Sequence, residues 1–252
     1  MNIIDCTLRD GGYYTNWDFS EQAIDNYLNS ISASGIDICE MGFRSTINSS
    51  YKGAVGFCTD EFLDQLDIPT NISLAVMLNA SELEGDINAE GVLNKLFPRS
   101  SNHSKVSIIR IAAHQRELSS AFSAARRLTS RGYKVCINLM QISSRTQAEI
   151  AAFANMATDS EIEAVYFADS TGGMTEKDIR DYIRIDLGQA IRHDPEMLLE
   201  ALEETASMFD LDEWKLLRFI LANEPMMHTH SYGFHTAYGR GIIDHFSSIY
   251  YN

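Results

Sequence analysis

Short runs of Ile, Val and Leu recur along the chain, and each is followed by a longer segment whose apolar residues return every three or four positions. The short runs predict buried strands and the longer segments predict amphipathic helices, for example over residues 21–32, 118–130 and 145–157. Such alternation builds βαβ units, whose right-handed crossovers produce a parallel sheet. The predicted strands begin near Asn2, Ile36, Asn71, Lys105, Lys134 and Ala164.

The length of the chain fits this repeat. A (β/α)8 barrel typically has about 250 residues in one domain, and the chain has 252. We therefore expect an α/β fold of TIM-barrel type, with residues 1–252 forming a single domain. Six βα units are clear as far as residue 184, whereas residues 185–252 read as two helices and an aromatic tail. The barrel is therefore predicted to be complete or shortened after its sixth unit.

Charge and composition exclude some classes of binding partner. The net charge of −15 argues against nucleic acid and anionic membranes, because both require a basic surface. No run approaches the roughly 20 apolar residues of a membrane span. The four cysteines form no CxxC pair and three fall in predicted strands, so we expect them to be reduced, in the cytoplasm.

Polar residues follow all six predicted strands. Because the carboxyl ends of parallel strands meet at one rim where ligands bind, we expect these side chains to gather there. Gly11 and Gly12 predict a sharp turn that lets two of them project from the end of the first strand. Taken singly, each is better explained as a helix cap or loop residue, and it is the recurrence at six strand exits that favours a site. They are Arg9, Asp10, Glu40, Arg44, Asn79, Arg110, His114, Asn138, Gln141, Asp169 and Ser170.

Three of the rim residues, Arg9, Arg44 and Arg110, are arginines in an acidic protein. A guanidinium holds a carboxylate through two parallel hydrogen bonds, so the rim predicts a pocket for a small carboxylate. The alternative is that Glu40 neutralises Arg9 or Arg44.

His228 and His230 form an HxH pair late in the chain. In a strand both imidazoles lie on one face and suit a single ion. With Asp10 they would form a two-nitrogen, one-carboxylate set for Mn²⁺ or Mg²⁺. The alternative is that these histidines are structural, because residues 232–238 resemble an aromatic packing element.

Four motifs together resemble the DRE-TIM metallolyases, a superfamily that includes 4-hydroxy-2-oxovalerate aldolase, 3-hydroxy-3-methylglutaryl-CoA lyase and the isopropylmalate and homocitrate synthases. The motifs are DCTLRDGGYY at residues 5–14, EMGFR at 40–44, NLM at 138–140 and ADSTG at 168–172. The resemblance covers residues 2–184 and is strongest to the aldolase-like branch.

The resemblance implies a (β/α)8 barrel with a divalent metal held by Asp10 and by the HxH pair. It also implies that Arg9 stabilises an enolate oxygen and that Glu40 orients Arg9. Tyr13 stands where the aldolases have a histidine base, so proton transfer would pass through Tyr13 or water. We expect the substrate to be bound by Arg44, Arg110, Asn138 and Asp169.

The chain departs from the family after Gly173. His228 comes 57 residues after Thr171 and only 22 residues follow His230. Either the pair begins a shortened seventh strand, or it belongs to a tail and the last two strands are absent.

The sequence thus predicts a metal-dependent lyase or aldolase acting on a small-molecule 2-oxo acid. One alternative is an acyl-CoA-dependent condensing enzyme of the same superfamily. The other is an inactive barrel remnant that acts as a binding subunit. The aromatic tail at residues 246–251 also suggests a homodimer.

Overall fold

Six parallel strands form one curved sheet in the order β1-β2-β3-β4-β5-β6. The computed structural model describes residues 3–47, 49–83, 89–170 and 172–175. The strands are β1 (Ile4–Asp5), β2 (Ile38–Phe43), β3 (Ser73–Asn79), β4 (Val106–Ala113), β5 (Lys134–Met140) and β6 (Ala164–Ala168). Every neighbouring pair is parallel. The predicted α/β fold of TIM-barrel type is confirmed as a curled half-barrel of six strands.

Helices follow the strands along the chain, as the alternation predicted. They are α1 (Thr7–Thr15), α2 (Glu21–Ala33), α3 (Asp60–Asp64), α4 (Ala89–Leu96), α5 (Leu118–Thr129) and α6 (Gln147–Thr158). Short 3-10 turns lie at Ala54–Gly56, Ala80–Leu83, Ser101–His103, Gln115–Glu117 and Ile142–Ser144. The helices predicted over residues 21–32, 118–130 and 145–157 correspond to α2, α5 and α6. No helix among the described residues is long and apolar enough to cross a membrane.

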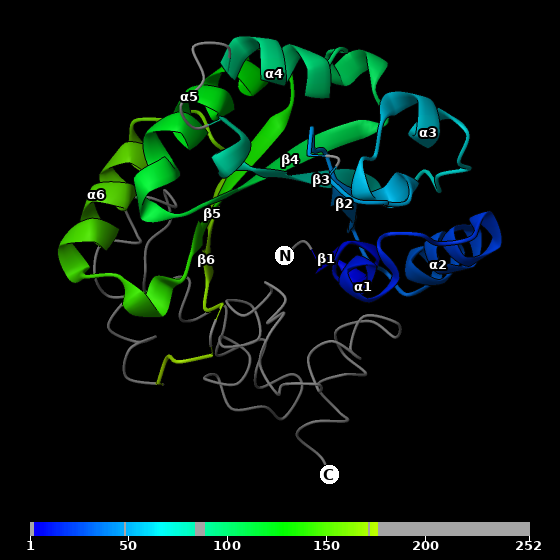
Figure 1. The fold of residues 1–252 in the computed structure, drawn as a ribbon, viewed down its shortest axis with the longest axis horizontal. Helices are drawn as coiled ribbons and strands as arrows, with labels where there is room; N and C mark the ends of the chain where they lie inside the picture. Colours follow the sequence, from blue (N-terminus) through cyan, green and yellow to red (C-terminus); the bar gives the residue numbers. More distant parts are fainter. Residues whose placement is uncertain (1–2, 48, 84–88, 171, 176–252) are drawn as a thin grey trace.

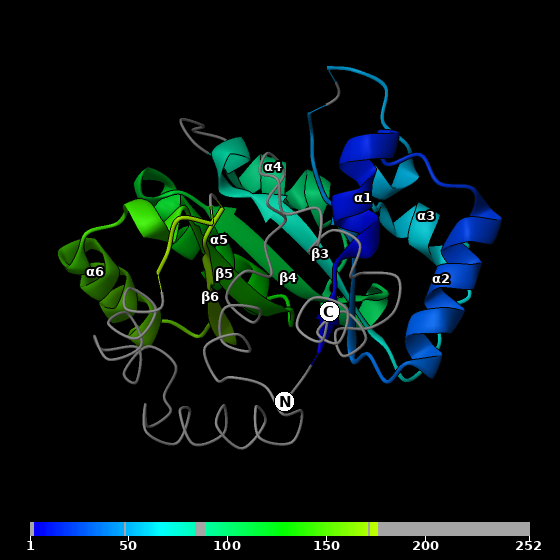
Figure 2. The same cartoon turned by 90° about the horizontal axis from the view of Figure 1, so that it is seen from below.

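The sheet has two faces with different contents. Helices α2 to α6 lie along its outer side (Figure 1), and Figure 2 shows the strands side by side from below. The main apolar core fills the space between the outer side and the helices, and it includes Val76, Ile109 and Ile137. A smaller cluster lies on the inner face and consists of Ile4, Cys6, Ala75, Ile108 and Cys136. Successive residues of a strand point to opposite faces, so the inner face receives every second residue.

The first helix corrects one expectation. Gly11 and Gly12 do not form a sharp turn, because α1 runs through both from Thr7 to Thr15. A Cβ atom on Gly12 would lie 2.0 Å from Cδ1 of Trp17. Gly12 is therefore explained by the close approach of an indole ring to the helix. The chain reverses later, where Asn16 and Trp17 adopt positive φ angles of 54° and 56°.

All four cysteines are buried and free, as predicted. Burial raises the pKa of Cys58 to about 12 and that of Cys136 to about 11. These thiols are therefore protonated at neutral pH, and such thiols are poor nucleophiles. The predicted boundary at residue 184, the late helices, His228, His230 and the aromatic tail lie outside the described residues.

Candidate active site

A buried cluster of charged side chains lies on the inner face of the half-barrel. Its centre is Glu40, the third residue of β2, which is fully buried. The Nε of Arg9 donates a hydrogen bond to Glu40 Oε1, and the Nη1 of Arg110 donates to Oε2 at 2.8 Å. One carboxylate thus joins two buried guanidinium groups.

Asp10 extends the cluster along α1. Its Oδ1 lies 2.9 Å from Nη1 of Arg9, and both side chains are 2% exposed. Arg9 therefore lies between the carboxylates of Glu40 and Asp10. The four groups carry two positive and two negative formal charges, and a balanced set of this kind is what allows charge to be buried.

The electrostatics favour an ionised Glu40. Burial is the largest effect and would raise the pKa of Glu40, but the combined attraction and hydrogen bonds of Arg110 and Arg9 lower it below its ordinary value. The carboxylate is therefore charged at neutral pH. A charged Glu40 fixes both guanidinium groups, because hydrogen bonds between ionised partners are the stronger kind.

Aromatic rings pack against both arginines. The Cζ of Arg110 lies 4.5 Å from the ring centroid of Tyr166, and the Cζ of Arg9 lies 5.8 Å from that of Phe43. Cations near ring faces are stabilised by the negative charge of the π system. Burial raises the pKa of Tyr166 to about 12, so its hydroxyl stays protonated. Neither ring is among the residues predicted for the site, although Tyr166 lies two positions from Ala164 on β6 and therefore shares the inner face with it.

Tyr13 lies beside the cluster and is 41% exposed. It is four residues after Arg9 in α1, so the two side chains share one helix face. The ring of Tyr13 contacts Phe43 at a centroid distance of 6.1 Å and Trp17 at 4.7 Å. Phe43 thus contacts both Arg9 and Tyr13.

Three predicted rim residues lie in strand interiors rather than after the strands, and a fourth, Asn79, is the last residue of β3. Glu40, Arg110 and Asn138 all fall in strand interiors, and Asn138 is fully buried on β5. Asn138 pairs in register with Tyr166, so the two share the inner face. These three residues therefore form an inner layer beside the apolar cluster of Ile4 and Ile108, within the strands rather than in the loops that follow them.

Two predicted substrate-binding residues have other partners. The guanidinium of Arg44 donates to the carbonyl oxygens of Cys58 and Leu96 and to the carboxylate of Asp60. The carboxylate of Asp169 accepts hydrogen bonds from the backbone N–H groups of Gly173 and Met174 at 3.1 and 3.0 Å. These contacts hold Arg44 and Asp169 at the ends of β2 and β6, and their binding of substrate stays a prediction.

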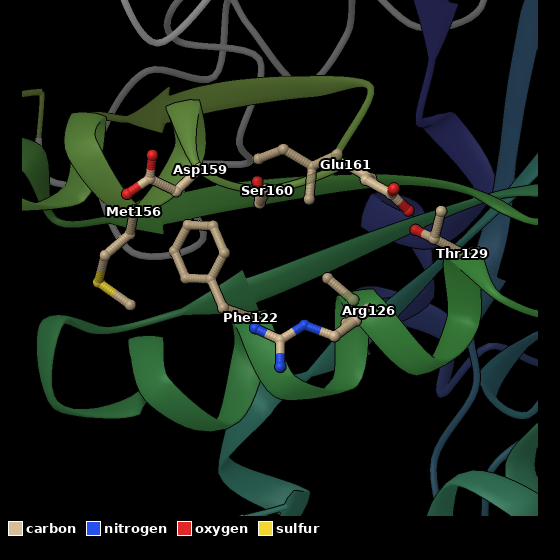
Figure 3. A pocket seen from close by; sticks show the side chains of 9 residues that line it. Phe122, Arg126, Thr129, Met156, Asp159, Ser160 and Glu161 are labelled. Atoms are coloured by element: carbon tan, nitrogen blue, oxygen red, sulfur yellow. The ribbon is translucent and has the colours of Figure 1, made fainter.

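A surface groove of about 540 Å³ lies elsewhere, between α5 and the end of α6. Figure 3 shows Arg126 and Thr129 on one side and Met156 and Asp159 on the other. The ends of helices lead back to the beginnings of strands, which is the side of a barrel that serves stability rather than ligand binding. None of the residues predicted for the site lines this groove, so the inner cluster is the candidate active site.

The described residues contain no group of three or more His, Cys, Asp or Glu side chains placed to hold a metal ion. Asp10 is the one member of the expected ligand set among them. A metal at this site would therefore need ligands from the remaining part of the chain, where His228 and His230 occur, or from water.

Two curated proteins are similar to residues of this chain over 184 positions. Oxaloacetate decarboxylase of Mycobacterium tuberculosis is 24% identical, and the match covers 72% of this chain and 51% of that protein. 4-Hydroxy-2-oxovalerate aldolase 6 of Rhodococcus jostii is 23% identical, and the match covers 72% of this chain and 49% of that protein. The chain thus spans about half the length of these relatives. No family model matches it.

Solved structures share the fold. The N-terminal domain of a proposed aldolase from Bacteroides vulgatus superposes with a TM-score of 0.60 at 24% identity, covering 88% of this chain and 85% of that one. Hydroxymethylglutaryl-CoA lyase from Pseudomonas aeruginosa superposes with a TM-score of 0.56 at 12% identity, covering 76% and 65%. With the curated relatives, these matches confirm the resemblance that the four motifs predicted.

Proposed function

We propose that this relative of the DRE-TIM metallolyases is a divalent-metal-dependent lyase that breaks a carbon–carbon bond at C3 of a 2-oxo acid. The observation that carries the proposal is the buried set of Arg9, Glu40 and Arg110 beside Asp10. Two fixed guanidinium groups and a carboxylate in one buried layer suit a reaction in which negative charge develops on a substrate oxygen.

The chemistry follows from the substrate class. When the bond between C3 and its leaving group breaks, the electron pair enters the C2–C3 bond and the C2 oxygen becomes an enolate. We assign Arg9 to this oxygen, because its guanidinium can oppose a charge that is greater in the transition state than in the substrate. We assign Arg110 and Asn138 to the substrate carboxylate. Glu40 holds both arginines, which lowers the cost of arranging them when substrate binds.

The named relatives support this class. Oxaloacetate and 4-hydroxy-2-oxovalerate are both 2-oxo acids in which C3 carries the group that leaves, as carbon dioxide from the first and as an aldehyde from the second. Both cleavages leave the enolate of pyruvate. An aldol cleavage also requires loss of the proton of the 4-hydroxyl group, and we assign its transfer to Tyr13 or to water.

We assign the metal to Asp10 together with His228 and His230. One carboxylate and two imidazoles suit Mn²⁺ or Mg²⁺, with positions left for substrate and water. When bound, such an ion acts as a Lewis acid toward the 2-oxo group. Asp10 would also keep Arg9 turned toward the site, through the contact of 2.9 Å between them.

The test measures pyruvate release from oxaloacetate and from 4-hydroxy-2-oxovalerate, with and without Mn²⁺. We expect metal-dependent release from at least one of them, and the two arms distinguish a decarboxylase from an aldolase. Arg9→Gln should lower kcat by about 100-fold or more, as loss of an oxyanion-stabilising group does. Arg127→Gln is the matched control, because Arg127 is an exposed arginine paired with Glu90 at 2.8 Å. Absence of release, or equal rates in both variants, would refute the proposal.

A further inference from the structure

We propose that Trp17 is a positioning residue that holds the turn of α1 carrying Arg9 and Asp10 against Glu40. The inference rests on the proposed function, because it concerns how that site is assembled. Trp17 acts through Arg9 in this scheme and does not itself touch the substrate.

The first support is a hydrogen bond. Nε1–H of Trp17 donates to the backbone carbonyl oxygen of Arg9 at 2.9 Å, in a partly buried position. A partly buried hydrogen bond of this kind helps to fix the backbone from which the guanidinium extends. The bond joins Trp17, the second residue after the end of α1, to the turn that carries the candidate site.

The second support is the packing against Gly12. A Cβ atom at that position would lie 2.0 Å from Cδ1 and 2.2 Å from Nε1 of the indole, well inside contact distance. Only glycine allows the ring to approach the helix this closely. Arg9 and Gly12 are three residues apart and therefore lie on the same side of α1. The indole thus contacts the helix at two points on one face.

The third support is the packing of the Trp17 ring against β2. The Trp17 ring centroid lies 5.7 Å from that of Phe43, the last residue of β2, and Nζ of Lys52 lies 5.3 Å from the indole. Phe43 in turn lies under the guanidinium of Arg9. Trp17 therefore connects α1 to β2, the strand that carries Glu40.

The consequence is a specific kinetic effect. A misplacement of about 1 Å in a catalytic group can reduce a rate by about 100-fold. Arg9 is assigned to a charge that develops in the transition state, and loss of such an interaction lowers kcat while KM is retained. We expect Trp17→Phe, which removes the N–H, to lower kcat by about tenfold and to change KM by less than about threefold.

The first experiment needs no turnover. The Nε–H of Arg9 is hydrogen-bonded to buried Glu40, so its proton should exchange slowly in an NMR spectrum, and Arg9→Lys identifies the signal. We expect Trp17→Phe to speed this exchange by at least about tenfold. The control is Tyr51→Phe, which removes an exposed hydrogen bond of 2.9 Å to Asp18, next to Trp17 in the chain. Unchanged exchange in Trp17→Phe, or an equal increase in Tyr51→Phe, would overturn the inference.

The second experiment separates positioning from general stability. If Trp17 acts through Arg9, Trp17→Phe should have little further effect on kcat in an Arg9→Lys background, whereas independent effects multiply. A benzothiophene ring in place of the indole keeps the shape and lacks the N–H, and it serves if Trp17→Phe does not fold. If wild type is inactive but Trp17→Phe speeds exchange of the Arg9 Nε–H as expected, only the proposed reaction is refuted. If the effects of the two substitutions on kcat multiply and the exchange rate is unchanged, only the role of Trp17 is refuted.

Discussion

Arg110 on β4 reaches across β3 to Glu40 on β2, and its Nη1 lies 2.8 Å from Oε2. Between them β3 presents Ala75, which pairs in register with Glu40 and belongs to the inner apolar cluster. Ala75 adds only a methyl group beside Glu40, whereas the β3 residue in register with Arg110 is Met77. The inner face of the half-barrel thus carries both the apolar layer that stabilises it and the charges proposed for catalysis.

Replacement of Glu40 by Gln should destabilise the protein strongly. The change leaves two buried guanidinium groups without their shared counter-charge, and removal of one partner from a buried ion pair costs about 3 to 5 kcal/mol. Urea unfolding followed by circular dichroism measures the change in the free energy of unfolding. Glu163→Gln is the control, because it breaks an exposed pair with Lys134 of 3.2 Å and should cost at most about 1 kcal/mol. Equal losses of unfolding free energy in the two variants would contradict the buried set of Arg9, Glu40 and Arg110.

Enlarging Ala75 should separate Arg110 from Glu40. Ala75→Leu adds volume to a packed layer, for which we expect a loss of about 1 to 3 kcal/mol in the free energy of unfolding. It should also reduce the coupling energy between Glu40→Gln and Arg110→Gln in a double-mutant cycle. Ala113→Leu, at a buried position in the core on the outer side of the sheet, should cost a similar amount and leave that coupling intact. Full coupling in Ala75→Leu would show that β3 does not limit the ion pair.

The sequence was sufficient to predict the sheet, but not that some of the site residues lie inside the strands. Buried parallel strands are continuous apolar runs, so Lys134 and Ala164 mark the beginnings of β5 and β6 as predicted. A polar residue on the inner face of a strand interrupts such an apolar run. In the sequence it looks the same as a polar residue that comes after the end of the strand. Glu40 and Arg110 were therefore expected at strand exits, although they lie inside β2 and β4.

The helical state of Gly11 and Gly12 was also beyond sequence reasoning. Glycine disfavours a helix interior by about 1 kcal/mol relative to alanine, so two consecutive glycines predict a turn. The contact between Gly12 and Trp17 supplies a tertiary reason for glycine that no local pattern contains. The grouping of Arg9 and Glu40 was expected because the resemblance implied it, whereas the contacts of Arg44 and Asp169 depend on loops that the sequence pattern does not describe.

Asp5 should make stability depend on pH in the direction opposite to Glu40. Burial raises the pKa of Asp5 above its ordinary value of 3.8, against the opposing hydrogen bonds from Tyr27 and Thr7. A carboxyl whose folded pKa is raised contributes stability below its unfolded pKa and loses it as pH rises through the folded pKa. Asp5→Asn does not titrate and keeps an oxygen that can accept from Thr7. The free energy of unfolding of Asp5→Asn minus that of wild type should therefore increase from about pH 4 toward neutrality. A difference that is constant or falls would contradict the raised pKa.

Asp10 is the described residue of the proposed ligand set, so Asp10→Asn should weaken binding of Mn²⁺. Loss of a charged oxygen ligand reduces the affinity for a hard divalent cation, and we expect the dissociation constant to rise by at least about tenfold. Titration with Mn²⁺ followed by EPR measures this directly, because bound and free Mn²⁺ give different signals. Asp64→Asn is the control, since Asp64 is a 45% exposed carboxylate paired with Arg99 at 2.7 Å. Stoichiometric binding at micromolar metal in wild type and in Asp64→Asn, with weakened binding in Asp10→Asn, would place the ion beside Arg9. Equal affinity in all three proteins would remove Asp10 from the ligand set, and no binding by wild type would instead favour a barrel that has lost its metal.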